Sequence, residues 1–431
     1  MDGNDSKAIP PSRNVLVIAY YFPPMGLSGV QRTLKFVKYL PQFGWQPTVL
    51  TVTPTGYYAQ DYTLLEEIRA SGIAVERVGS LDPNRLFRKK GVVKMPSERW
   101  RKILTYISDT LFIPDNKIGW KRKAIKKAEE LFAQTKFDVI FATAPPFTDF
   151  LIGKALADKF KKPLVIDYRD PWHEYPYKYY PTPLHKWRNY VLEKRVLRAA
   201  SRIITTNRRV KELILKRFKF LQYNDITILP QGFDPADFAN GKMEARKPDV
   251  MRMTHAGVFY GDRTPEYFLR ALQKVVAEKP ELKQKIDVFF VGNLHDAHAE
   301  MVKSFGLTEC VTMTGYLDHP HCVQALQSSD VLWLMLNNDK QSPGKVYEYL
   351  GARKPMLACV PEGFIRQTIE EAGGSVIVPP TDVNAIADAI KNFYELFKQR
   401  KLPKPDESVV SNYDRVELTN ELSKIFGFLA E

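Results

Sequence analysis

Residues 342–349 have the types and the spacing needed to bind a phosphorylated ligand. Ser342 suits the N-cap of a helix, and Gly344 then leaves the backbone amides of the helix N-terminus open to an anion. Lys345 adds a mobile cation, and Glu348, one turn further along, can accept hydrogen bonds from both hydroxyls of a ribose. The alternative is an ordinary surface ion pair between Lys345 and Glu348.

Two glycines in the first half of the chain also have the spacing of a ligand loop. Gly26 and Gly29 lie between an apolar run and a helical pattern, where they let the backbone approach a phosphate or a sugar closely. Their G-x-x-G spacing differs from the dinucleotide-binding pattern G-x-G-x-x-G. A plain turn between strand and helix is the alternative.

A charged pair, Arg169 and Asp170, directly follows the apolar run P-L-V-I-D-Y. Loops at this end of parallel strands form binding sites. Arg169 can reach a phosphate and Asp170 can orient a hydroxyl group, while His173 is a further candidate acid or base. A structural ion pair of Arg169 with Asp167 or Asp170 is the alternative.

These candidates need a scaffold, and the chain supplies apolar, β-branched runs that alternate with amphipathic helical patterns. This alternation predicts parallel sheets that are covered by helices on both faces. We predict thirteen strands, at residues 14–20, 46–53, 74–78, 137–144, 163–168, 202–206, 226–229, 252–257, 286–292, 311–316, 331–336, 355–359 and 375–378.

Residues 231–250 break this alternation with proline, glycine and charge, as an interdomain linker does. We therefore predict an α/β protein with two Rossmann-like, doubly wound domains that face a central cleft. The N-terminal domain would span 1–240, with a basic helical insertion near 81–125, and the C-terminal domain 241–400. Residues 401–431 would form a helix that packs back toward the N-terminal domain.

Composition limits the classes of function. The 431 residues are 44% hydrophobic, as in packed soluble domains. Apolar runs stay well below the roughly 18 residues that span a bilayer, the N-terminus lacks a signal-peptide pattern, and three scattered cysteines form no disulfide framework. We therefore expect a cytoplasmic protein. The chain has no Asp-x-Asp and no His/Cys/Asp cluster with metal-ligand spacing, so we expect no metal site.

The net charge of +14 is unevenly distributed. Residues 85–127 contain 14 Lys/Arg and 3 Asp/Glu, and residues 186–219 contain 12 and 2. Apolar residues recur at helical spacing in the first of these windows: Trp100, Ile103, Leu104, Ile107 and Leu111. Such a basic amphipathic helix can lie on an anionic membrane surface, or it can pack its apolar side on the domain. No nucleic-acid-binding motif accompanies the charge, so we expect no nucleic-acid partner.

Several segments, in order, resemble GT-B-fold glycosyltransferases, particularly the retaining family 4. They are N-V-L-V-I-A-Y-Y-F-P-P-M-G-L-S-G-V-Q-R, L-P-Q-G-F-D, V-F-F-V-G-N, T-G-Y-L and S-P-G-K-V-Y-E-Y-L-G-A-R-K-P. The resemblance covers most of the chain. It implies a hexosyltransferase-like enzyme of surface polysaccharide or glycan biosynthesis, with a nucleotide-diphosphate sugar as donor and no cofactor. The acceptor would be a saccharide or lipid-linked, at the inner face of the membrane, and the transfer would retain the anomeric configuration.

The same resemblance implies roles for residues of the second half. It places Gly257 and Arg263 against the donor diphosphate. There Arg263 and Lys345 would be catalytic, because their charges would stabilise the leaving group without a metal ion. It also places Tyr316 and Leu317 at the nucleobase, with ordinary hydrophobic packing as the alternative.

Two further places can be compared with the family pattern, and the chain departs from it clearly at the second. Arg169-Asp170 stands where members often have His-Asp, and we assign Asp170 to the catalytic residues. Lys340 stands where members usually have a second glutamate that contacts the donor sugar, with Asp339 adjacent. The departure at Lys340 leaves the sugar open and suggests one alternative, an inactive nucleotide-sugar-binding scaffold. A sugar-nucleotide epimerase of the same fold is a separate alternative.

Overall fold

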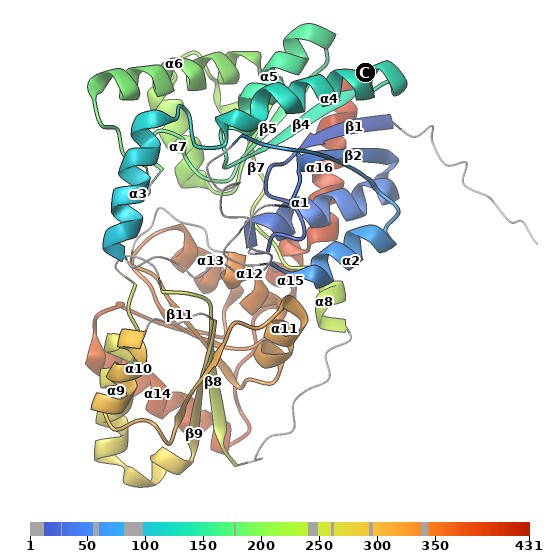
Figure 1. Cartoon of the computed structure of the whole chain (residues 1–431). Coiled ribbons are helices and arrows are strands. Elements are labelled where there is room, and N and C mark those ends of the chain that lie inside the picture. The colour runs from blue at the N-terminus through green and yellow to red at the C-terminus, as the bar shows by residue number, and fades with distance from the viewer. Residues whose placement is uncertain are drawn as a thin grey trace, which may run out of the picture. The chain divides into compact units, whose positions relative to one another are not determined.

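The computed structural model describes residues 13–26, 28–54, 60–81, 98–175, 178–239, 249–259, 263–292, 296–337 and 344–431. The chain forms two compact units: unit 1 consists of Met1–Pro230 and Val416–Glu431, and unit 2 of Gln231–Arg415. Each unit contains one parallel sheet with helices packed on it (Figure 1).

The sheet of unit 1 has seven parallel strands. In sheet order they are β3 (Ala74–Val78), β2 (Trp45–Val52), β1 (Arg13–Ile18), β4 (Val139–Ala144), β5 (Leu164–Tyr168), β6 (Arg202–Thr205) and β7 (Ile226–Ile228). The helices are α1 (Ser28–Tyr39), α2 (Tyr62–Ala70), α3 (Glu98–Leu111), α4 (Lys121–Gln134), α5 (Thr148–Phe160), α6 (Pro183–Ala199), α7 (Arg208–Arg217) and α16 (Arg415–Ala430). Strand order reverses between β1 and β4, which is where sheets of this type place their ligand loops.

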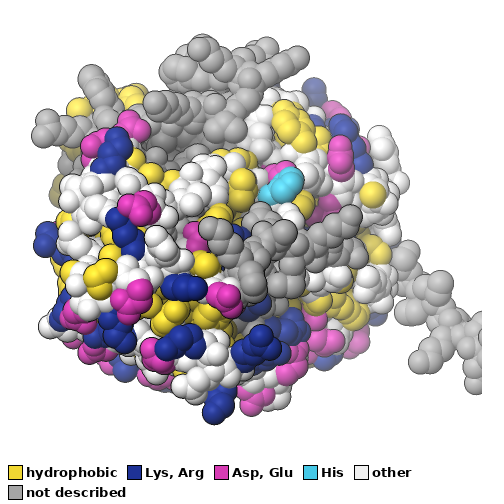
Figure 2. Space-filling model, turned by 90° about the horizontal axis from the view of Figure 1, so that it is seen from below, with side chains coloured by type: hydrophobic (Ala, Val, Ile, Leu, Met, Phe, Trp, Pro, Cys, Tyr) yellow, Lys and Arg dark blue, Asp and Glu magenta, His cyan; other side chains and the backbone are white. Residues whose placement is uncertain are grey.

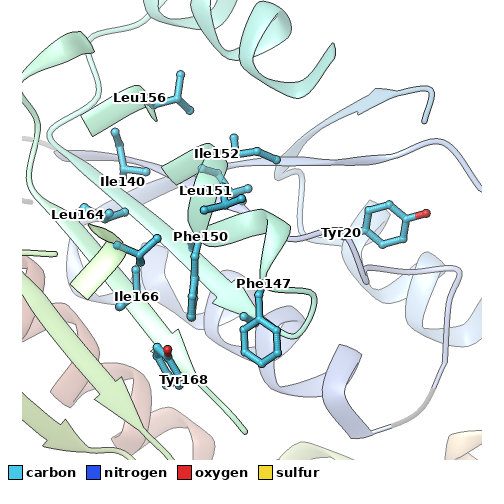
Figure 3. Packing of buried hydrophobic residues seen from close by; sticks show 14 of the residues in the cluster. Tyr20, Ile140, Phe147, Phe150, Leu151, Ile152, Leu156, Leu164, Ile166 and Tyr168 are labelled. Atoms are coloured by element: carbon cyan, nitrogen blue, oxygen red, sulfur yellow. The ribbon is translucent and has the colours of Figure 1, made fainter. Parts of the chain in front are cut away.

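Both faces of this sheet are buried under apolar side chains. On one face, Phe150, Ile152 and Leu156 of α5 pack against residues of β4 and β5, as Figure 3 shows. On the other face, α16 contributes Phe426, whose ring lies 5.3 Å from the ring of Trp45. The C-terminal helix is therefore part of the core of unit 1.

The sheet of unit 2 has six parallel strands. In sheet order they are β10 (Val311–Gly315), β9 (Ile286–Val291), β8 (Met251–Ala256), β11 (Val331–Met335), β12 (Met356–Cys359) and β13 (Val376–Val378). The helices are α8 (Pro235–Ala239), α9 (Glu266–Glu278), α10 (Asp296–Ser304), α11 (His319–Gln327), α12 (Gly344–Gly351), α13 (Phe364–Ala372), α14 (Val383–Lys398) and α15 (Glu407–Val410). Strand order reverses between β8 and β11, and α12 follows β11.

The predicted fold class is confirmed. All thirteen predicted strands are present, with ends within two residues of the prediction, and they form two Rossmann-like sheets. Unit 2 begins at Gln231 and extends to Arg415, whereas the predicted limits were 241 and 400. The reason is local: Phe233 N donates to Tyr413 O at 3.0 Å, and Arg415 N donates to Phe233 O at 2.9 Å. The first residues of the expected linker are thus built into unit 2.

The two units differ in charge. Unit 1 contains 41 Lys/Arg and 24 Asp/Glu, whereas unit 2 contains 22 and 25. The excess of positive charge therefore belongs to unit 1. On the face of the molecule in Figure 2, Lys and Arg side chains are interspersed with Asp and Glu. None of the helices in the described parts of the chain combines the length and the hydropathy needed to span a bilayer.

Candidate functional site

Three neighbouring strands of unit 2 are followed by, or end in, glycines with positive φ: 137° at Gly257, 132° at Gly292 and 73° at Gly315. Their backbones are in contact, because Gly257 N donates to Val291 O at 2.7 Å and Gly292 N donates to Gly315 O at 2.8 Å. A Cβ atom on Gly292 would lie only 2.7 Å from Gly257 O. The carboxyl ends of β8, β9 and β10 thus form a stretch of backbone without side chains.

Lys345 lies directly beside this glycine backbone. A Cβ atom on Gly257 would be 1.9 Å from Lys345 Nζ, so a larger residue would displace the end of the lysine, and the φ of 137° also favours glycine. Lys345 is in the first turn of α12, so its charge adds to the positive end of that helix. Burial lowers the pKa of Lys345 to about 7, and the charge of Arg263 acts in the same direction, while Glu348 opposes it.

Lys345 and Glu348 do not pair with each other. Among the residues that the structure describes, neither side chain forms a hydrogen bond or an ion pair, although they are one helical turn apart. The ion pair that the sequence left as an alternative is therefore not formed. A cation and a carboxylate at this spacing, both without protein partners, are suited to an anionic ligand that also carries hydroxyl groups.

Tyr349 holds α12 against the sheet at the point where strand order reverses. Its hydroxyl accepts a hydrogen bond from Ala256 N at 2.7 Å and donates one to Trp333 O at 3.3 Å, which joins β8 to β11. His255 Nδ1 lies 3.0 Å from the same Trp333 carbonyl. Burial and the charges of Lys345 and Arg263 lower the pKa of His255, so this ring is neutral.

The remaining predicted residues of unit 2 have different surroundings. Arg263 is half-buried, and its charge acts on both Lys345 and His255. Tyr316 is 37% exposed, whereas Leu317 packs against the apolar cluster that contains α12, as the alternative of hydrophobic packing expects. The predictions for Ser342, Lys340 and Asp339 concern positions outside the described residues and stay predictions.

In unit 1, Arg169 connects the loop after β5 to the start of α1 and the end of β4. Its guanidinium donates to Ala144 O at 3.2 Å and also to Gly29 O and Pro145 O. A Cβ atom on Gly29 would be 2.7 Å from Arg169 Nη1, so this glycine makes room for the arginine; Gly26 is buried. Arg169 therefore holds the start of α1, the end of β4 and the loop after β5 together. The phosphate contact that the sequence predicted for Arg169 stays a prediction.

Asp170 and His173 are close to that arginine in sequence but have different environments. Asp170 accepts no hydrogen bond from the described part of the chain, and burial raises its pKa while the charge of Arg169 opposes this. His173 is buried and stacked on Tyr180, with ring centroids 5.1 Å apart. Burial lowers the pKa of His173 to about 4, so the ring is neutral at pH 7 and is a poor proton donor.

The carboxylate of Asp167 forms an ion pair with Arg32 and not with Arg169. Arg32 Nη2 lies 3.0 Å from Asp167 Oδ1, and both side chains are buried. The same arginine donates to Leu229 O at 3.0 Å and to Pro230 O at 2.6 Å. The alternative of an ion pair between Arg169 and Asp167 is therefore wrong. Asp167 is structural, as one alternative proposed, but with a partner that sequence reasoning missed.

Two family models match the chain. The model described as Glycosyltransferase Family 4 matches residues 28–237, and the model described as Glycosyl transferases group 1 matches residues 252–395. The first match lies in unit 1, except for residues 231–237, which belong to unit 2. The second match lies within unit 2. The chain is a GT-B glycosyltransferase of the family 4 type. No curated protein matches its sequence.

Solved structures show that this glycosyltransferase shares its fold with proteins of low sequence identity. Anabaena HepE, in complex with UDP and glucose, is 14% identical, with a TM-score of 0.61 over 97% of this chain and 100% of that one. Sucrose-phosphate synthase from Thermosynechococcus elongatus is 14% identical, with a TM-score of 0.61 over 97% and 99%. WaaG, a glycosyltransferase involved in lipopolysaccharide biosynthesis, is 13% identical, with a TM-score of 0.58 over 96% and 99%.

The structure thus gathers the predicted site residues of the glycosyltransferase into two groups. Gly257, Arg263, Lys345 and Glu348 belong to one group in unit 2, and Gly29, Arg169 and Asp170 to another in unit 1. Sequence reasoning did not assign roles to Gly292, Gly315, Tyr349 or Arg32. The two glycines had a signal, because each stands at the end of a predicted strand. Tyr349 and Arg32 had none, since their partners are distant in sequence.

Proposed function

We propose that this glycosyltransferase takes a nucleotide-diphosphate sugar as its donor, with the diphosphate at the N-terminus of α12 and the ribose on Glu348. The observation that carries this is that Lys345, which lies beside the glycine backbone after β8, and Glu348, one turn further along α12, have no side-chain partner among the described residues. Phosphate at a helix N-terminus gains both backbone amides and the helix dipole. A solved structure of the same fold, HepE, holds UDP and glucose, which supports a nucleoside diphosphate here.

The charges beside this backbone suit the departure of a diphosphate. Lys345 and Arg263 would neutralise the negative charge that develops as the glycosidic bond opens, without a metal ion. The transfer would retain the anomeric configuration, with the donor phosphate itself accepting the proton of the acceptor hydroxyl. Asp170, which makes no hydrogen bond within the described chain, would orient that acceptor.

The acceptor that we propose is a saccharide or a lipid-linked saccharide of surface polysaccharide or glycan biosynthesis, at the cytoplasmic face of a membrane. The excess of Lys and Arg in unit 1 supports an anionic surface or acceptor on that side of the enzyme. WaaG, of the same fold, is involved in lipopolysaccharide biosynthesis, which supports an acceptor of this class.

Replacing Glu348 with alanine is expected to weaken binding of the matching nucleoside diphosphate by about 10- to 100-fold, since hydrogen bonds to a charged group contribute about 1.5–3 kcal/mol. Thermal-shift and calorimetric titrations with several nucleoside diphosphates would measure this and name the base. The dideoxy form of the same nucleotide, which lacks the ribose hydroxyls, should bind wild type and variant equally.

Glu309→Ala, which removes an exposed carboxylate elsewhere in unit 2, is the control and should bind like wild type. If Glu348→Ala weakens binding of the dideoxy nucleotide as much as binding of the natural nucleotide, the carboxylate does not act on the ribose. No response to any nucleotide would refute the proposed donor. Release of nucleoside diphosphate only when an acceptor is present distinguishes a transferase from a scaffold or an epimerase.

Nucleoside diphosphate binding should depend on pH through Lys345. The free amine has a pKa of about 7, and only its charged form attracts the diphosphate. Because deprotonation opposes binding, affinity should fall between pH 7 and pH 9, by at most about tenfold per pH unit. Calorimetry at several pH values would measure the change, and Lys345→Met should bind with a flat profile. The same slope in both proteins would assign the titration to another group.

A further inference from the structure

Eight large apolar side chains are exposed on two neighbouring segments of unit 1. Between 41% and 68% of each is exposed. They are Ile103, Leu104, Tyr106, Ile107 and Leu111 on α3, and Tyr179, Leu184 and Trp187 in and just before α6; we call them the α3–α6 apolar surface. The alternative in which α3 packs its apolar side on the domain is therefore wrong for its described side chains. Exposure of so many large apolar groups together marks an interaction surface.

Direct contacts make α3 and the start of α6 one surface. Tyr179 N donates to Asp109 Oδ2 at 2.8 Å, and His185 Nε2 lies 3.1 Å from Thr110 O. The rings of Tyr106 and Tyr179 are 6.5 Å apart. Figure 1 shows α3 beside one end of α6. Two segments that are far apart in the sequence thus present their apolar groups together.

The exposed charge next to this surface is positive. Lys186 and Arg188 are exposed in the same turns of α6 as Leu184 and Trp187, and Arg195 and Arg198 are exposed further along. The acidic residue of α6, Glu193, is buried and accepts a hydrogen bond from Tyr168 at 2.7 Å.

On α3, the carboxylate of Asp109 is half-buried and is occupied by Tyr179 N. The described acidic side chains of both helices therefore form hydrogen bonds within the protein. The surface complements a partner of uniform negative charge.

We propose that the α3–α6 apolar surface docks this glycosyltransferase on an anionic lipid bilayer. Leu184, Trp187, Ile107 and Leu111 would enter the boundary between headgroups and acyl chains, where tryptophan is favoured. Lys186 and Arg188 would bind the anionic headgroups while their aliphatic stems cover apolar surface. The surface shares no residue with the donor site in unit 2, so the two can be tested separately.

Vesicle sedimentation of the full chain tests the proposal. We expect binding to vesicles of phosphatidylglycerol and phosphatidylcholine at low salt, little binding to pure phosphatidylcholine, and weakening as salt is raised. The double variant Leu184→Ser/Trp187→Ser should bind the anionic vesicles at least tenfold more weakly. Phe428→Ser is the matched control, because Phe428 on α16 is 69% exposed and lies outside the surface, and it should bind like wild type.

Fluorescence quenching by brominated lipid distinguishes insertion from attraction by charge alone. Wild type should be quenched, and Trp187→Phe should still bind while losing most of the quenching. Unchanged vesicle binding by Leu184→Ser/Trp187→Ser would overturn the proposal, and so would a wild type that binds no vesicle. If the wild type is a dimer and Leu184→Ser/Trp187→Ser is a monomer, the surface binds a second copy of the chain, and the membrane proposal is also overturned. Thermal shifts with nucleotide, equal in wild type and variant, show that the variant is folded and report separately on the donor site.

Discussion

Replacement of Lys345 by methionine is expected to lower kcat/KM for the nucleotide sugar by about 10²–10³-fold, the effect of removing one charge-stabilising group from an active site. Methionine keeps an aliphatic chain beside Gly257 but removes the charge. The ammonium group has no protein partner in the described chain, so the variant leaves no carboxylate unpaired and should fold normally. The loss should therefore be in turnover and in nucleotide affinity, while stability is retained.

Steady-state release of nucleoside diphosphate, with both substrates varied, measures this loss. Lys274→Met is the control, because Lys274 is an exposed lysine of unit 2 that donates to Asn384 at 2.7 Å and is not part of the site. Arg263→Met should also lower turnover, since the charge of Arg263 acts on Lys345 beside the glycine backbone. A Lys345→Met enzyme with turnover within threefold of wild type would contradict the assignment of the diphosphate to α12.

The candidate donor site could be predicted as a group because its residues are close together in the sequence. Gly344, Lys345 and Glu348 lie within one helical turn or so, and helix geometry alone sets their relative positions. Gly257 was found through the resemblance to the family. What the sequence did not contain was the contact between Gly257 and Lys345, which depends on how β8 and α12 meet in the folded unit.

The roles of Arg169 and Asp167 were not predictable for the opposite reason. Arg169 follows β5, yet its partners are Gly29 in the first turn of α1, Ala144 at the end of β4, and Pro145 just after β4. Asp167 stands two residues before Arg169, but it lies inside β5 and pairs with Arg32 of α1, whereas Arg169 lies beyond the end of the strand. Opposite charges that are close in the sequence are therefore not sufficient to predict an ion pair.

The basic amphipathic helix illustrates a different limit. Apolar spacing correctly predicted a helix around Ile103 and Leu111, and the structure has α3 at Glu98–Leu111. Periodicity identifies which side of a helix is apolar, but it does not say what covers that side. The exposure of these residues, and the addition of Leu184 and Trp187 to the same surface, became visible only when α3 and α6 were brought together.

Replacing Arg32 with methionine is expected to lower the free energy of unfolding of unit 1 by about 3–5 kcal/mol, because one charge of a buried ion pair would be left uncompensated. The carboxylate of Asp167 would keep only the hydroxyl of Thr143, at 3.0 Å, and the carbonyls of Leu229 and Pro230 would lose their donor. A loss of this size is a large share of the roughly 5–15 kcal/mol that stabilises a folded domain.

Urea unfolding followed by tryptophan fluorescence measures this loss, with Arg208→Met as the control, since Arg208 is exposed and pairs with Glu212 on the helix surface. The control should change stability by less than about 0.5 kcal/mol. The double variant Arg32→Met/Asp167→Leu should be more stable than Arg32→Met alone, because it removes the unpaired carboxylate as well. If the double variant is no more stable than the single one, the carbonyls of Leu229 and Pro230, and not the buried carboxylate, account for the loss.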